Sequence, residues 1–137
     1  ETLDLLKPKR IGHGVRSFED PNLIERLKKE KIHLELCLTS NMVTKVYKDF
    51  FNHPIDELYK KNLSISINSD GRTISNTNLC KEYSLISKHF MWDDNDFLNC
   101  NLSNNSSLSS PIITSIISSY CCKNILQILF FKINYII

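Results

Sequence analysis

Three short apolar segments alternate with three amphipathic segments over the first 90 residues, and this alternation constrains the fold more than any other feature. The apolar segments have the length and composition of buried strands, and they cover residues 9–13, 32–38 and 63–69. The amphipathic segments have helical periodicity, and they cover residues 21–31, 54–62 and 81–90. No hairpin signal separates successive apolar segments, so we predict an α/β fold with parallel strands and right-handed helical crossovers.

Three parallel strands are too few to form a closed fold. They cannot complete a barrel, and three helices cannot cover both faces of a parallel sheet. The first residues also look like the end of a helix that leads into a strand, and no initiator methionine precedes Glu1. We therefore expect the chain to begin in mid-domain and to contain about the last three strand–helix units of a (β/α)8 TIM-like barrel.

The composition excludes several other classes of protein. A net charge of +2 and a charged fraction of 23% favour a globular core over a nucleic-acid-binding surface or a disordered chain. The five cysteines have no C-x-x-C spacing, so neither a disulfide framework nor a zinc ribbon is indicated. This cysteine usage favours a reducing compartment, and we expect a cytoplasmic location.

Two of the predicted strands end in motifs that carry an ionisable side chain. RIGHG at residues 10–14 presents His13, and SINSDG at residues 66–71 presents Asp70. The carboxyl ends of parallel strands meet at one face of a barrel, so these two side chains are expected at a common mouth. A histidine and an aspartate placed there can bind a metal or act on a metal-bound water. Taken singly, each also fits a structural role, as a hydrogen-bonded loop histidine and a turn-capping aspartate.

The other histidines are assigned structural roles, and none is assigned to zinc. His33 lies within a strand pattern, His53 precedes a proline and is expected to help cap a helix, and His89 lies near a helix end. Cys37 is expected to be a small buried side chain. Residues 39–41, Thr-Ser-Asn, are expected to form the turn that closes the second strand.

The character of the chain changes after residue 92, and we expect a division into residues 1–92 and residues 93–137. Asp93 and Asp94 are expected to cap a short helix, and residues 101–110 are rich in Asn and Ser. Residues 111–137 are apolar but interrupted by polar residues, with no run of the ~18 apolar residues that a membrane span needs. We predict an irregular tail there, as a truncated chain or an erroneous gene model would produce.

Four motifs together resemble the C-terminal half of the adenosine deaminases, a family of the metallo-dependent hydrolase superfamily. They are RIGHG, ELCLTSN at residues 35–41, HPI at residues 53–55 and ISINSD at residues 65–70, in the family's order and approximate spacing. The resemblance covers residues 1–92. The family's zinc-binding H-x-H and its HAGE segment have no counterpart in this sequence.

The resemblance implies zinc-dependent hydrolytic deamination of adenosine and 2'-deoxyadenosine to inosine and 2'-deoxyinosine, a reaction of purine metabolism. In this family three histidines and one aspartate bind zinc, which lowers the pKa of the water that attacks C6 of the purine. Asp70 matches the aspartate ligand, and His13 matches the catalytic histidine that contacts the attacking water. The glutamate that protonates the purine belongs to HAGE. We therefore expect this chain by itself to be inactive.

Gly71 departs from the family pattern at a substrate-binding position. Many family members have a second aspartate there, which hydrogen-bonds N7 of the purine. The glycine leaves a related adenine or AMP deaminase as an alternative, and a non-catalytic remnant is a second alternative. The sequence argues against a cytidine deaminase, because the P-C-x-x-C signature of its zinc site is absent.

Overall fold

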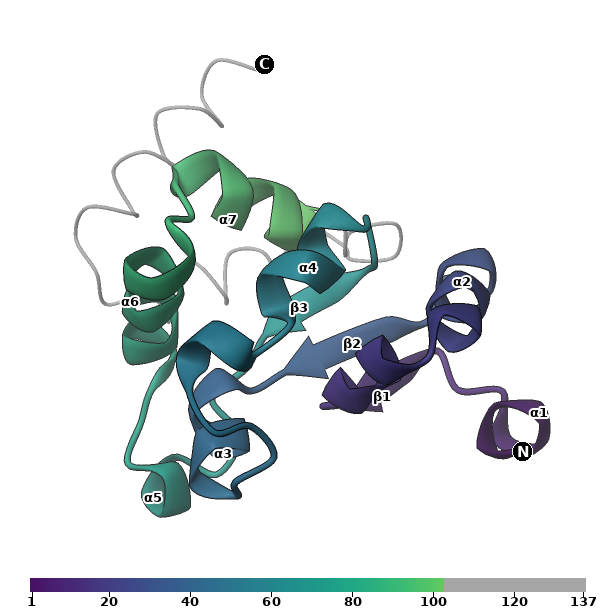
Figure 1. Cartoon of the computed structure of the whole chain (residues 1–137), viewed down its shortest axis with the longest axis horizontal. Coiled ribbons are helices and arrows are strands. Elements are labelled where there is room, and N and C mark those ends of the chain that lie inside the picture. Colours follow the sequence, from purple (N-terminus) through teal and green to yellow (C-terminus); the bar gives the residue numbers. More distant parts are fainter. Residues whose placement is uncertain (103–137) are drawn as a thin grey trace, which may run out of the picture. The chain divides into compact units, whose positions relative to one another are not determined.

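A three-stranded parallel sheet lies at the centre of the computed structural model, which describes residues 1–102 (Figure 1). Its strands β1 (Arg10–Gly12), β2 (His33–Leu36) and β3 (Ile65–Ile67) are arranged in the order β1-β2-β3. Both neighbouring pairs are parallel. The predicted α/β class and parallel pairing are therefore confirmed, although the strands are shorter than the apolar segments that predicted them.

The two faces of the sheet differ because successive side chains of a strand point to opposite sides. Ile11, Leu34 and Ile65 are aligned in register and form part of an apolar face. In the next row of the sheet, Gly12, Glu35 and Ser66 are aligned on the opposite face. The apolar face packs into the core, whose fully buried aliphatic side chains are Leu27, Leu34, Leu36, Leu38, Ile55, Leu58, Ile65 and Ile86.

Hydrogen bonds and an ion pair connect the polar side chains of the sheet. An Nη atom of Arg10 lies 2.6 Å from Oε1 of Glu35 on the neighbouring strand. Nδ1 of His33 lies 2.9 Å from Oγ of Ser64, and Nε2 lies 2.8 Å from Oγ of Ser66. Burial lowers the pKa of His33 to about 4. These contacts agree with a structural role for His33.

The first crossover contains the 3-10 helix η1 (Val15–Glu19) and helix α2 (Pro21–Lys29). The Asp20 carboxylate caps α2 by accepting backbone N–H groups, and Pro21 occupies the first helical position, as the sequence predicts. The helix ends before Lys31, whose φ of +53° is left-handed and cannot continue it.

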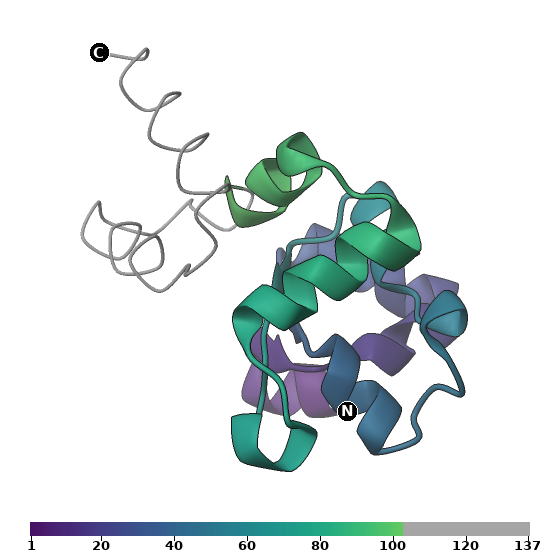
Figure 2. The same cartoon turned by 90° about the vertical axis from the view of Figure 1, so that its left-hand side faces the viewer.

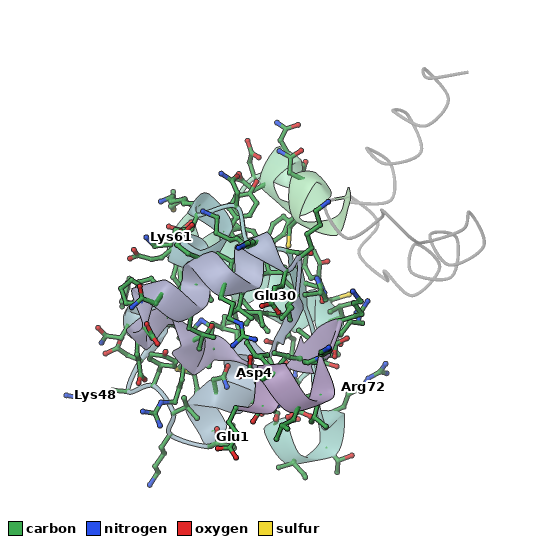
Figure 3. The ribbon with its side chains drawn as sticks, turned by 90° about the vertical axis from the view of Figure 1, so that its right-hand side faces the viewer. Glu1, Asp4, Glu30, Lys48, Lys61 and Arg72 are labelled. Atoms are coloured by element: carbon green, nitrogen blue, oxygen red, sulfur yellow. The ribbon has the colours of Figure 1, made fainter. Side chains whose placement is uncertain are left out.

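The short helix α1 (Thr2–Leu6) is joined to α2 by charged side chains. An Nη atom of Arg26 in α2 lies 2.6 Å from Oδ1 of Asp4 in α1. Its Nε lies 2.7 Å from Oε1 of Glu30, one turn further along the chain. Figure 3 labels both of these acidic residues. Such exposed pairs contribute little stability individually.

The second crossover differs from the sequence-based expectation. Residues 39–41 do not form a simple turn but lie within helix α3 (Leu38–Val43). The 3-10 helix η2 (Phe50–Asn52) and helix α4 (Ile55–Lys60) follow. Thr, Ser and Asn favour turns through local hydrogen bonds, but here groups of all three residues bind partners from other elements. These tertiary contacts override the local preference.

Within the described part of the chain, β3 is followed by helices α5 (Arg72–Ser75), α6 (Leu79–Phe90) and α7 (Asp94–Leu102). Helix α6 begins two residues before the predicted segment, because Asn78 caps it by accepting the N–H of Lys81. It crosses the near side of the molecule in Figure 2. Asp93 accepts the N–H groups of Asn95 and Asp96, which confirms the expected cap of α7.

The first compact unit of the chain runs over Glu1–Asn104, so α7 belongs with the sheet. Phe97 of α7 is buried, and the centroid of its ring lies 4.8 Å from the centroid of the Tyr83 ring. The expectations for the Asn/Ser-rich segment and the apolar tail lie outside the described residues. Within residues 1–102 no helix is long and apolar enough to cross a membrane.

Candidate active site

His13 and Asp70 lie together at the carboxyl ends of β1 and β3. Nε2 of His13 is 3.6 Å from Oδ2 of Asp70, and both side chains are about two-fifths exposed, at 42% and 44%. The expected convergence of these two side chains at the carboxyl-terminal end of the sheet is confirmed. The catalytic role of His13 and the metal-binding role of Asp70 stay predictions.

The backbone at both positions is left-handed, with φ of +59° at His13 and +54° at Asp70. This conformation is uncommon for residues other than glycine. The N–H of His13 donates to the carbonyl of Glu35 at 2.9 Å, so the end of β1 stays tied to β2. The chain thus turns sharply at each strand end and presents one ionisable side chain there.

Ser40 is the residue of this site that sequence reasoning missed. Its hydroxyl donates to Oδ2 of Asp70 at 2.7 Å, the oxygen that also faces His13. Ser40 lies on α3, which begins just after β2. The sequence contains a signal for it, because Ser40 closely follows the middle strand. Its hydroxyl is therefore expected at the same carboxyl-terminal end of the sheet as His13 and Asp70.

The hydrogen bond from Ser40 lowers the pKa of Asp70, and the backbone N–H of Gly71 and the nearby His13 act in the same direction. Partial desolvation opposes them but does not prevail. Asp70 is therefore an ionised carboxylate at neutral pH, which suits a group that binds a cation or accepts a hydrogen bond.

A cavity of about 490 Å³ opens beside these residues. His13, Ser40 and Asp70 contribute to its lining, and Leu27 and Leu34 contribute apolar side chains. The volume lies within the roughly 300–1,000 Å³ range of small-molecule sites. Nδ1 of His13 is buried without a hydrogen-bond partner, which is rare for a buried polar atom.

A catalytic zinc ion takes three protein ligands, and the described residues do not supply them. No group of three His, Cys, Asp or Glu side chains within residues 1–102 is arranged to hold a metal ion. Cys37 is buried beside this end of the sheet, and burial raises the pKa of its thiol to about 12, so the thiol is protonated in the metal-free chain. His13 and Asp70 alone are too small a set of ligands for catalytic zinc.

Gly71 is exposed and precedes α5, with an ordinary φ of −64°. A Cβ atom at this position would approach only Ile74, at 3.7 Å, which is normal van der Waals contact. The backbone therefore does not require glycine here. The next residue, Arg72, extends away from the ribbon in Figure 3.

Comparisons with known proteins agree on one family. The family model described as Adenosine deaminase matches residues 1–116. An adenosine deaminase of Streptococcus mutans is 44% identical over 93 residues, which are 68% of this chain and 27% of that protein. An adenine deaminase of Chelativorans sp. is 39% identical over 92 residues, which are 67% of this chain and 28% of that protein.

A solved structure shows the same fold. The crystal structure of adenine deaminase from Arthrobacter aurescens matches 98% of this chain and 39% of its own, with a TM-score of 0.77 and 22% identity. The parallel sheet and its helices are thus consistent with part of a TIM barrel. The chain spans less than a third of the length of the two curated relatives described above. Because the family model covers most of its residues, the chain belongs to the adenosine deaminase family.

Proposed function

We propose that this chain forms one part of the active site of a hydrolytic purine deaminase and contributes the last three strand–helix units of its barrel. The observation that carries the proposal is the 3.6 Å approach of His13 to Asp70 at the mouth of a cavity. Membership of the adenosine deaminase family supports the reaction class. Adenosine and 2'-deoxyadenosine are the substrates that we propose first.

His13 and Asp70 have different roles in this proposal. The imidazole of His13 contacts the attacking water, orients it and stabilises charge that develops on the oxygen. Asp70 is one ligand of a zinc cofactor, and its ionised carboxylate suits that role. The other zinc ligands come from residues outside 1–102, because within that range no three His, Cys, Asp or Glu side chains are arranged to hold a metal ion. The chain alone is therefore expected to be inactive.

Deamination of free adenine is the second candidate reaction. Gly71 supplies no carboxylate where many family members have an aspartate, and the described relatives include an adenine deaminase. A site without that carboxylate holds the purine by fewer hydrogen bonds. The choice between nucleoside and free base therefore depends on the rest of the cavity.

The experiment uses a chimera in which the matching segment of this chain replaces its counterpart in the Streptococcus mutans adenosine deaminase. Zinc-loaded chimera is assayed with adenosine, adenine and AMP by the ultraviolet change on deamination, beside the 137-residue chain with added zinc. We expect activity in the chimera only. It should be lost in His13→Ala and Asp70→Ala but retained in Glu57→Ala, which changes an exposed residue of α4.

Two results would contradict the proposal. Turnover by the chain alone that disappears on chelation would show that the described pair is not the incomplete site we infer. An inactive chimera that folds and binds zinc would favour the non-catalytic remnant.

A further inference from the structure

Three consecutive residues of α3 are bound to three different parts of the molecule. The backbone N–H of Thr39 donates to Oε2 of Glu82 on α6 at 3.0 Å. The Ser40 hydroxyl donates to Asp70 at 2.7 Å. The Asn41 side chain accepts a hydrogen bond from His53, which precedes α4, at 3.0 Å. In Figure 1 the arrow of β2 points toward α3, so these contacts are made where the strand ends.

From this arrangement we propose that Glu82 and His53 are positioning residues, which hold α3 so that Ser40 reaches Asp70. The inference rests on the proposed function, because Asp70 belongs to the proposed site. Neither residue contacts substrate in this proposal. Each acts through α3 and the Ser40 hydroxyl.

Glu82 is an unusual residue to bury. It is 0% exposed, and its described hydrogen bonds come from the Thr39 N–H and from the Thr77 hydroxyl, at 2.6 Å, rather than from Lys or Arg. Burying a carboxylate is costly unless hydrogen bonds compensate it. A leucine would fill a similar space without the free-energy cost of desolvating a carboxylate. The hydrogen bonds that Glu82 accepts therefore explain why a carboxylate is present. One of these is an N–H at the beginning of α3, which has no partner within the helix.

His53 holds the same helix from another direction. It is 1% exposed, and its Nδ1 accepts the N–H of Ile55 at the start of α4, as expected for a capping residue. The proton of the neutral ring is therefore on Nε2, which donates to Oδ1 of Asn41. The histidine thus joins α3 to α4 through two directed hydrogen bonds.

The length of α3 explains why such contacts matter. It has six residues, and isolated helices of fewer than about 12–15 residues are marginal in water. Successive residues of a helix point in directions about 100° apart. The Ser40 and Asn41 side-chain contacts therefore restrain the rotation of α3 about its axis, and the contact of the Thr39 backbone N–H, which points along the axis, restrains its position. Ser40 is 4% exposed between these two anchors.

The first test measures geometry in the 137-residue chain and does not depend on activity. Nuclear magnetic resonance at fixed pH records the Thr39 amide proton shift, the Asp70 carboxyl carbon shift and the contact between Ser40 and Asp70. In Glu82→Leu we expect an upfield Thr39 amide, a changed Asp70 shift and loss of the Ser40 contact. Glu82→Gln should retain the contact, since its carbonyl can accept the Thr39 N–H and its amide can donate to Thr77.

Glu57→Leu is the matched control, because it makes the same chemical change at an exposed position of α4 and should alter none of these signals. If Glu82→Leu fails to fold, Thr77→Val is used instead, because it replaces the hydroxyl that donates to Glu82 with a methyl group of similar size; it should weaken the Ser40 contact in a folded chain. Survival of the contact in folded Glu82→Leu, or an unchanged contact in Thr77→Val when Glu82→Leu does not fold, overturns the proposal.

The second test is a double-mutant cycle in the active chimera. Ser40→Ala is expected to lower kcat by about 10–100-fold, the range for groups that orient ligands of a catalytic site, with little change in KM. Glu82→Leu should have a similar effect alone and little further effect in the Ser40→Ala background. Additive losses would show that Glu82 does not act through Ser40. An inactive chimera leaves the resonance test decisive, so failure of the proposed function is distinguished from failure of this inference.

Discussion

Replacing Gly14 by alanine should destabilise the fold strongly, although the change adds only one methyl group. Gly14 follows His13 and has a φ of +65°, which costs a residue with a Cβ atom about 1–2 kcal/mol. The added Cβ would lie 2.9 Å from Cδ2 of Leu34 and 3.3 Å from Cγ2 of Ile11. Leu34 is fully buried, so it cannot move aside freely, and overpacking adds about 1–3 kcal/mol.

The total loss is about 2–5 kcal/mol, a large share of the ~5–15 kcal/mol that stabilises a typical domain. Urea unfolding of the whole chain, followed by circular dichroism, should show the midpoint lowered by about 1–2.5 M, for an m-value of about 2 kcal/mol/M. Gly71→Ala is the matched control. Its φ is ordinary and its Cβ would meet only Ile74 at 3.7 Å, so stability should be unchanged or rise by up to about 1 kcal/mol. Equal midpoints for the two variants would refute the reasoning.

Three further predictions follow from the ionisable groups. Burial lowers the pKa of His33 and His53 to about 4, so between about pH 6.5 and pH 4 these side chains bind more protons in the unfolded chain than in the folded one. The free energy of unfolding should therefore fall as the pH drops through this window, and a flat urea midpoint there would contradict the prediction. Ser40→Ala should raise the pKa of Asp70, measured by carbon resonance titration, because the largest cause of its lowered value is removed. The thiol of Cys37, with a pKa raised to about 12, should react with a thiol reagent far more slowly in the folded chain than in urea, as peptide mass mapping would show.

Some features follow from short stretches of sequence, because their causes are local. Asp20 and Pro21 define the start of α2 through a side-chain cap and a fixed backbone angle, and both effects act within one helical turn. The alternation of strands and helices predicts parallel pairing, because each crossover returns the chain to the same direction. Because the strands are parallel, the same rule also places His13 and Asp70 at the carboxyl-terminal end of the sheet, before any distance between them is known.

Other features were decided only by the tertiary structure. The Thr-Ser-Asn segment has the local chemistry of a turn, yet it is helical because Thr39 and Asn41 find partners on other elements. Ser40 and Asp70 are 30 residues apart, and Thr39 and Glu82 are 43 apart, so no local pattern links either pair.

The sequence by itself therefore determined the alternation of the three strands with the main helices α2, α4 and α6, and which strand ends carry ionisable groups. Only the tertiary structure determined which buried side chain holds which helix. Periodicity, caps and turn residues act over a few neighbouring positions, whereas the partner of a buried polar group is chosen when distant elements pack and every such group must find a hydrogen bond. Glu82 illustrates the difference, because its place in α6 follows from helical periodicity, while its hydrogen bond to α3 depends on how the two helices meet.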